Sequence, residues 1–153
     1  IKLPPVENKA LKKNMKTLSP QELESLRERE RHFIECLRGC YISAVKKDFS
    51  LVLDKSNEIG SLNKFDIKEF FSFGVNFIRQ SYLYSQKVDQ LYEFESLNNF
   101  SIENFAPFIS RRNYKRLISL FENTMHYVDR NANTKLLATS FLLDLSRILY
   151  SNN

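Results

Sequence analysis

Apolar residues recur every three or four positions along most of the chain, and this spacing predicts α-helices. The first helix is predicted from about Pro20 to Lys47, because Ser19 followed by Pro20 is typical of a helix start. The second half of this helix is expected to pack against the other helices. Glu30, within the alternating charges of residues 28–31, interrupts the stripe and predicts a solvent-exposed stretch. The apolar stripe consists of Leu23, Leu26, Phe33, Leu37, Cys40 and Ala44.

Two more helices follow in the pattern. Asp48 is expected to cap the first and Gly60 to end it, and Asn63 is expected to cap the second. Gly74 and Ser81 are small residues on an aromatic-rich face, so we expect a neighbouring helix to approach closely there. The predicted apolar faces are Phe49, Val52, Leu53 and Ile59 in the first helix, and Ile67, Phe70, Phe71, Gly74, Phe77, Ile78 and Ser81 in the second.

The C-terminal third carries three more helical segments. A short helix is predicted from Ser101 to about Pro107, a longer one is capped by Asn113, and a last one runs from about Ala132 to Tyr150. The last is apolar over more than half its circumference, so we expect it either at the centre of the bundle or docked against another protein. The inward residues of the middle helix are expected to be Leu117, Ile118, Phe121, Met125 and Val128.

These elements predict an all-α protein, with a single bundle of about five to six helices over residues 19–151 and a basic arm over residues 1–18. No segment alternates like a strand, and 3 Gly and 4 Pro among 153 residues are too few for the turns of an all-β sandwich. Gly39, Gly60 and Gly74 lie too far apart to form a phosphate-binding loop.

The net charge of +5 is concentrated at the N-terminus. Residues 1–18 carry five lysines and one glutamate, which gives +4 and leaves +1 for the rest. A nucleic-acid-binding domain is expected to show a basic face, and the body of the chain has one basic cluster. We interpret this cluster as a solvated helix start, with contact to phosphates or an acidic partner as the alternative. The arm lysines are Lys2, Lys9, Lys12, Lys13 and Lys16, and the cluster is Arg111, Arg112, Lys115 and Arg116.

Histidine and cysteine are scarce and badly placed for catalysis. His32, Cys36 and Cys40 recur at four-residue intervals, but eight residues span about 12 Å of a helix, which is too far for one metal ion. His126, near a predicted helix end, is expected to be structural. The sequence therefore predicts no catalytic residue, no metal and no cofactor in this chain.

The remaining candidates lie in or beside the least periodic region. Glu93 and Glu95 are paired carboxyl groups, but nothing in the sequence places them face to face. Tyr82, Tyr84 and Tyr92 are less clearly internal than the phenylalanines, and their role stays open between core packing and the stacking of single-stranded nucleic acid.

Cysteine usage and hydropathy predict the compartment. Two cysteines four residues apart on a helix are poorly placed to bridge each other, and free thiols fit a reducing cytosol. The sequence shows no signal peptide and no apolar run of 18 or more residues, so we expect a cytoplasmic protein without a membrane span. The chain begins with Ile1 rather than Met, and we interpret it as a fragment of a longer protein.

The most distinctive residues lie near the C-terminus. Phe105-Ala106-Pro107-Phe108-Ile109 is followed by His126-Tyr127, by Arg130-Asn131-Ala132-Asn133 and by Lys135, which leads into the last apolar helix. This series, with these intervals, resembles the C-terminal region of bacterial DNA polymerase III subunit delta-prime, especially the Bacteroidetes-type sequences. The likeness extends over roughly residues 33–150, and the Arg-Asn-Ala-Asn segment is its most specific part.

The resemblance implies a subunit of the pentameric clamp loader, which uses ATP to place the sliding clamp on primed DNA. In that family the AAA+-like modules lie upstream, and the C-terminal helical bundle forms, with the other subunits, the closed collar that holds the pentamer together. It implies an oligomerisation module without catalysis or small-molecule substrate, whose partners are the other clamp-loader subunits and which meets DNA only through the whole complex. The expected interface residues are Phe105, Pro107, Phe108, Arg130, Asn131, Asn133 and Lys135.

The residues themselves leave alternatives open. Asn131 or Asn133 is expected to end one helix and begin the next, with Arg130 bonding the last free carbonyls, and we favour this over contact with a neighbouring subunit. The apolar surplus of the last helix predicts that part of its surface, or of the helix after Asn63, packs on another subunit. The main alternative function is a nucleic-acid-binding domain that uses the lysine-rich arm and the cluster of residues 111–116, and an enzyme ranks third.

Overall fold

The computed structural model describes residues 18–87 and 95–151. Within these ranges it contains helices and no strand, so the predicted all-α bundle is confirmed. Among these helices, none is both long enough and apolar enough to cross a bilayer. The predicted arm lies outside the described residues, except for Leu18. The α-helices are α2 (Pro20–Lys46), α3 (Ser50–Gly60), α4 (Lys64–Ser85), α5 (Arg111–Asp129) and α6 (Thr134–Ser151), and two 3-10 turns are η1 (Ile102–Asn104) and η2 (Ala106–Phe108).

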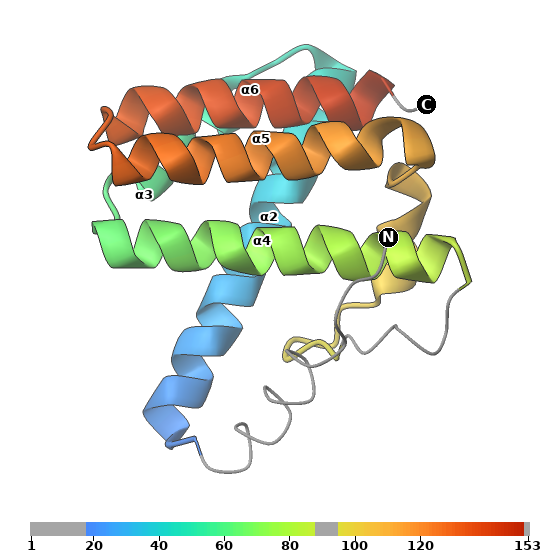
Figure 1. Cartoon of the computed structure of the whole chain (residues 1–153), viewed down its shortest axis with the longest axis horizontal. Coiled ribbons are helices and arrows are strands. Elements are labelled where there is room, and N and C mark those ends of the chain that lie inside the picture. The colour runs from blue at the N-terminus through green and yellow to red at the C-terminus, as the bar shows by residue number, and fades with distance from the viewer. Residues whose placement is uncertain (1–17, 88–94, 152–153) are drawn as a thin grey trace.

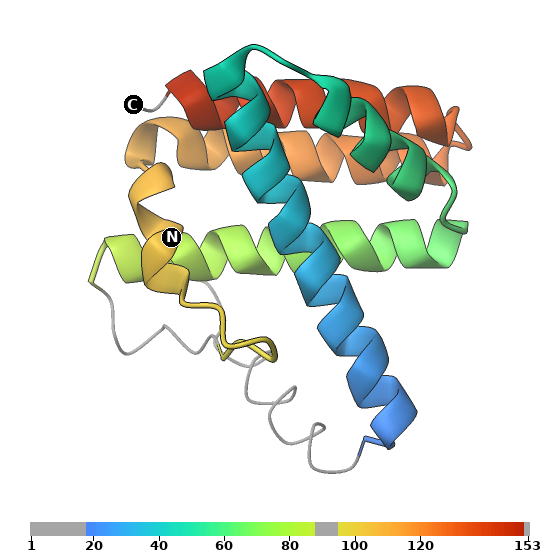
Figure 2. The ribbon, with the colours of Figure 1, turned by 180° about the vertical axis from the view of Figure 1, so that it is seen from behind.

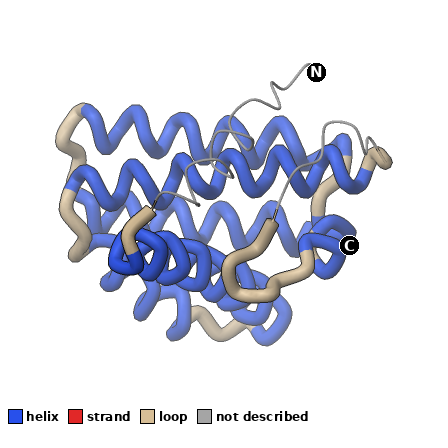
Figure 3. Tube along the Cα trace, turned by 90° about the horizontal axis from the view of Figure 1, so that it is seen from below, coloured by secondary structure: helices blue, strands red, loops and turns tan. Residues whose placement is uncertain are grey.

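Three helices lie side by side and a fourth crosses them. Figure 1 shows α4, α5 and α6 as roughly parallel rods, with α2 running obliquely behind them. The reverse view shows α2 in front and α3 lying along α6, against which it packs (Figure 2). Seen from below, short loops join α2 to α3, α3 to α4, and α5 to α6 (Figure 3). The loop after α5 is so short that α6 returns antiparallel beside it.

Helix α6 is covered on its apolar side by three neighbouring helices. It packs against α2, α3 and α5, and its inward side chains are buried. Contacts within the chain account for this inward face, and the alternative of docking on another protein stays a prediction. Its apolar surface is therefore largely covered within the chain, although Leu136 and Tyr150 remain exposed. The buried residues of α6 include Ala138, Phe141, Leu142, Leu145, Ile148 and Leu149.

Phenylalanines from four helices meet in the middle of the bundle, and we call this cluster the aromatic centre. The centroid of the Phe121 ring lies 4.9 Å from that of Phe141 and 6.0 Å from that of Phe33. Gly74 makes this approach possible, because a Cβ there would lie 2.4 Å from Phe121 and 2.6 Å from Phe33. The predicted apolar face of α4 is confirmed in full. The aromatic centre consists of Phe33, Phe70, Phe71, Phe77, Phe121 and Phe141.

Helix α3 departs from its predicted apolar face. Val52 and Ile59 are buried, but Phe49 and Leu53 are exposed. The reason is position, because α3 lies on the outside of the bundle and touches α2 and α6 with one side. Ser56 is buried on that side and donates its hydroxyl to the carbonyl of Val52 at 2.7 Å. Periodicity alone assigned too wide a buried face to this short helix.

The helix starts are formed by residues close to those predicted. The side chain of Asn63 accepts from the amide of Asp66 at 2.8 Å, so the predicted cap of α4 is confirmed. Asp48 precedes the N-cap residue of α3, which is Phe49, and its carboxylate accepts from the amide of Ser50 at 3.1 Å. The predicted role of Asp48 is therefore displaced by one residue.

The predicted cap of α5 is wrong. Ser110 is the N-cap residue, and its side chain accepts from the amide of Asn113 at 3.3 Å. Asn113 lies in the first turn, where its side-chain oxygen accepts from the amide of Ser110 at 2.8 Å and its nitrogen donates to the carbonyl of Phe108. The two residues form a reciprocal capping box, a pattern in which Asn replaces the usual Glu or Gln.

Gly60 ends α3 as predicted, but for a different reason. No described glycine has a positive φ angle, so left-handed backbone does not explain it. A Cβ at Gly60 would lie 2.9 Å from the Cα of Lys135, and the hydroxyl of Thr134 donates to the carbonyl of Gly60 at 3.1 Å. The glycine thus lets the end of α3 touch the backbone at the start of α6.

The prediction that residues 28–31 lie in solvent is wrong for Glu30, which is 2% exposed. Its carboxyl group accepts from the amide of Leu97 at 3.0 Å and from the hydroxyl of Ser96. The segment from residue 95 to 101 folds back over α2, and Asn98 also donates to the carbonyl of Arg27 at 3.0 Å. Glu30 is buried because the later segment brings donors to it.

Candidate functional site

The two cysteines belong to the core. Both thiols are buried, and the Cys40 thiol donates to the carbonyl of Leu142 at 3.6 Å. Burial raises the pKa of Cys40 to about 11, and burial with the neighbouring Cys40 sulfur raises the pKa of Cys36 further. Raised pKa values suppress the thiolate, which is the form that attacks substrates and binds metals. Among residues 18–87 and 95–151, no group of three or more His, Cys, Asp or Glu could hold a metal ion.

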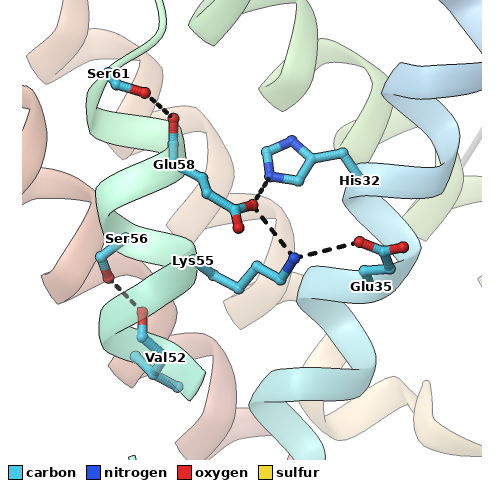
Figure 4. Close-up of polar contacts among 7 residues, drawn as sticks. All are labelled: His32, Glu35, Val52, Lys55, Ser56, Glu58 and Ser61. Carbon is cyan, nitrogen blue, oxygen red and sulfur yellow. Dashed lines mark hydrogen bonds and ion pairs between the residues drawn. The ribbon is translucent and has the colours of Figure 1, made fainter. Parts of the chain in front are cut away.

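His32 lies in a network of charged groups that joins α2 to α3. Its Nε2 atom lies 3.1 Å from the carboxylate of Glu58, and the ammonium of Lys55 donates to both Glu58 and Glu35 at 3.2 Å (Figure 4). Burial lowers the pKa of His32, although Glu58 acts in the opposite direction. The ring also lies 5.3 Å from the ring of Phe70. We interpret this network as a polar joint between two helices.

A polar cleft of about 690 Å³ opens beside this joint. Three of its four carboxyl groups have cationic partners on their own helices, since Glu24 lies 3.9 Å from Arg27, Glu28 pairs with Arg31, and Glu58 lies 3.2 Å from Lys55. Acid–base catalysis needs carboxyl groups that converge on a substrate, whereas these are tied to neighbours on their own helix. The cleft is lined by Gln21, Glu24, Ser25, Glu28, Arg29, His32, Glu58, Ser61, Leu62, Asp66 and Phe70.

An apolar groove of about 280 Å³ lies between the C-terminal half of α2 and the segment that carries η1 and η2. One residue of the lining, Ile42 on α2, is 46% exposed. Arg38 is the one cation in the lining, and its guanidinium lies 5.6 Å from the centroid of the Phe100 ring. The groove is lined by Ile34, Leu37, Arg38, Tyr41, Ile42, Phe100, Asn104, Phe105, Phe108 and Leu149.

Two of the predicted interface residues line this apolar groove. Phe105 is buried in its floor, and Phe108 is half-buried with its ring 4.8 Å from that of Tyr41. The two phenylalanine rings stack on each other at 6.0 Å. Pro107 is exposed and does not line the groove. The turn η2 therefore divides the motif, with its aromatic residues inward and its proline outward.

The Arg130–Asn133 segment is a helix-to-helix turn, as the favoured interpretation predicted. Asn131 has a left-handed φ of 59°, and the side chain of Asn133 accepts from the amide of Leu136 at 3.0 Å. Arg130 is the C-cap residue of α5, and its backbone amide donates to the carbonyl of His126 at 3.2 Å. The ammonium of Lys64 also donates to the carbonyl of Asp129 at 3.3 Å. These bonds account for the segment within the chain.

Lys135 is exposed and lies outside the apolar groove, like the three polar residues of the preceding turn. Its structural contribution is its backbone, which meets Gly60. The structure therefore separates six of the seven predicted interface residues into two groups, and Pro107 belongs to neither. Phe105 and Phe108 line the apolar groove, whereas Arg130, Asn131, Asn133 and Lys135 lie at the α5–α6 turn.

The predicted basic cluster is exposed along the first turns of α5. Lys115 and Arg116 line a second groove, of about 400 Å³, between α5 and α6. The nitrogen Nε of Arg111 instead donates to the side chain of Gln86 at 3.4 Å. Tertiary structure adds Arg147 of α6 to the cluster, which no spacing in the sequence could reveal.

The remaining candidates are placed as follows. The ring of Tyr82 stacks on that of Tyr114 at 4.1 Å, so its packing is internal, and Tyr84 is half-buried. Glu95 and His126 are exposed. Tyr92 and Glu93 lie outside the described residues, as do the arm lysines.

The residues that sequence reasoning missed are those of the groove wall. Ile34, Arg38 and Tyr41 follow one another on α2 at spacings of three or four, which was a detectable signal beside the main stripe. Phe100 lies in an irregular segment, where periodicity gives no signal.

No known protein family, no curated protein and no solved structure matches this chain.

Proposed function

We propose that this chain is a protein–protein assembly module, the C-terminal collar domain of a delta-prime-type subunit of a bacterial clamp loader. On this proposal it acts in the cytosol, its partners are the other clamp-loader subunits, and it catalyses no reaction of its own. The resemblance over Phe105–Ile109 and Arg130–Asn133 supports the family, and the all-α bundle agrees with the fold that the family implies.

One observation carries the assembly role, namely the apolar groove with its exposed rim. Soluble proteins bury most large apolar side chains, and a contiguous exposed patch rimmed by polar residues is typical of a protein-binding surface. Ile42 is half-exposed and lines a cavity that already contains aromatic rings. Arg38 gives the rim a cation, and Arg and aromatic side chains are the residues that dominate binding energy in interfaces.

The test is purification of the full-length parent protein from its own cells, followed by identification of the proteins that come with it. The Ile42→Asp variant should lose these proteins, because it puts a charge on the rim of the groove while leaving the buried core intact. Phe65→Asp is the matched control, since Phe65 is 68% exposed and lies in the first turn of α4, outside the groove.

The outcomes separate the two parts of the proposal. Co-purification of clamp-loader subunits with the parent and with the Phe65 variant, but not with the Ile42 variant, supports both parts. Partners of another class contradict the family. Clamp-loader subunits that remain bound to the Ile42 variant contradict the groove as the binding surface.

A further inference from the structure

The groove between α5 and α6, which we call the basic groove, carries a second kind of surface. Figure 1 shows the two helices side by side along their length. The groove holds about 400 Å³ and is lined by residues from both helices. Its lining consists of Lys115, Arg116, Ser119, Leu120 and Asn123 of α5, and of Asp144, Arg147 and Ile148 of α6.

The lining is positively charged. It contains three cationic side chains and one carboxylate, that of Asp144, which pairs with Arg147 at 3.1 Å. Arg112 lies one helical turn before Arg116 and extends the positive row on the same side of α5. Arg147 is 72% exposed at its side chain, so its guanidinium can meet a ligand despite its ion pair with Asp144.

The start of α5 strengthens this potential. Its first turn contains Arg111 and Arg112 and no acidic residue. The N-terminus of a helix carries partial positive charge and is normally matched by Asp or Glu. Here the side chains and the helix dipole have the same sign, and an anion bound beside this turn would relieve the repulsion.

The side chains also distinguish the kind of anion. Protein interfaces depend on large apolar or aromatic anchors, but the basic groove has no exposed one, since Ile148 is buried and Leu120 is half-buried. Its other polar residues, Ser119 and Asn123, are of the types that contact phosphate oxygens beside Arg and Lys. The apolar groove on α2 has the opposite composition.

We propose that the basic groove binds the phosphate groups of a nucleic-acid backbone, through Arg116, Arg147 and Lys115 with Arg112 beside them. This inference does not depend on the proposed collar function. It adds a direct contact that the resemblance does not include, since the family implies contact with DNA only through the whole complex. The recognition is of backbone charge, so we expect little dependence on base sequence.

The test measures fluorescence anisotropy of labelled oligonucleotides with the whole chain at 50 mM salt. Single-stranded DNA, duplex DNA and single-stranded RNA are compared, because the phosphate chemistry is common to all three. The double variant Arg116→Gln/Arg147→Gln should weaken binding about tenfold or more and reduce the salt slope by about two. Lys46→Gln/Lys135→Gln is the matched control, because it removes the same charge from exposed residues outside the groove.

A gain of binding provides a second measurement. Asp144→Asn removes the one carboxylate of the lining, and it should tighten binding more than Asp54→Asn, which changes the net charge equally at an exposed site on α3. Thermal unfolding shows whether each variant keeps the fold.

Four outcomes would overturn the proposal. The first is that no oligonucleotide binds at 50 mM salt. The second and third are that the two double variants lose oligonucleotide affinity equally, and that the two aspartate variants change it equally. The fourth is that a poly-glutamate peptide binds the groove when the oligonucleotides do not. The last result would assign the groove to an acidic protein. The proposal is supported if the Arg116/Arg147 variant alone loses oligonucleotide binding and the Asp144 variant binds the oligonucleotides more tightly.

Discussion

The aromatic centre and the N-terminal half of α2 are held by different physics. In the aromatic centre, phenylalanines from four helices contact edge to face, and Gly74 gives them room. The N-terminal half of α2 is held by polar contacts, in which Glu30 bonds Leu97, His32 meets Glu58, and Arg29 lies 3.3 Å from Glu69. Apolar contacts tolerate many partners, whereas each polar group requires a specific donor or acceptor.

The difference between these two regions shows which contacts stabilise the fold and which contacts fix how one segment docks on another. Apolar burial contributes in proportion to area and has little direction. Hydrogen bonds contribute less on balance, but a buried group that loses its partner is costly. The aromatic centre should therefore determine most of the free energy of unfolding. The polar contacts should determine how the segment from residue 95 to 101 docks on α2.

The largest effect is expected from Phe121→Ala. Phe121 is fully buried and touches rings from three other helices, so truncation should lower the free energy of unfolding by about 3–5 kcal/mol. Phe65→Ala is the control, since Phe65 is largely exposed and should cost little. Denaturant unfolding measures both, and a similar cost for the two variants would contradict the central role of the aromatic cluster.

The next effect is expected from Glu30→Ala. It leaves the hydroxyl of Ser96 and the amide of Leu97 without their acceptor, which should cost about 1–3 kcal/mol. Hydrogen exchange should also become faster at residues 96–100, which tests docking separately from global stability. Glu24→Ala, on the exposed part of the same helix, should change neither quantity. Unchanged exchange in the Glu30 variant would show that other contacts dock this segment.

Substitution of two glycines by alanine tests how closely neighbouring side chains pack against the helix backbone. Gly74→Ala places a Cβ against two buried rings, and overpacking costs typically about 1–3 kcal/mol, offset by roughly 1 kcal/mol of helix propensity. Gly39→Ala is the matched control, because its Cβ would meet the end of the half-exposed side chain of Leu51, which can rotate away. We expect destabilisation at Gly74 and neutral or improved stability at Gly39 in thermal unfolding. The reverse order would refute the packing of Gly74.

The smallest effect concerns pH and the polar joint. Burial lowers the pKa of His32 in the folded state, so the unfolded chain binds the proton more readily. The associated stability is therefore complete above the ordinary histidine pKa of about 6.5 and declines as the pH falls toward the lower folded value. His32→Gln should therefore lose less stability than the wild type between pH 7 and pH 5.5, as thermal unfolding at each pH would measure. Identical pH profiles would show that His32 does not titrate in this way.

The comparison also explains which predictions the sequence allowed. The apolar face of α4 followed from spacing, as did Leu117, Phe121 and Val128 of α5, whereas Ile118 and Met125 of α5 are only half-buried. Spacing failed at Glu30, whose donors are more than sixty residues away, and at α3, whose outer position leaves Phe49 and Leu53 exposed. For the candidate site, the motif identified Phe105 and Phe108 but not Arg38 or Phe100 across the groove.

The amino-acid sequence by itself determined the helices, most of their starts and the residues of the core, because propensity, capping and periodicity act over a few neighbouring positions. Only the tertiary structure decided that α6 packs on α2, α3 and α5, that Gly60 meets Lys135, and that Arg147 joins the cations of α5. These features depend on contacts between residues far apart in the chain. Local rules do not encode such contacts, because many arrangements of the same helices cover the same apolar stripes.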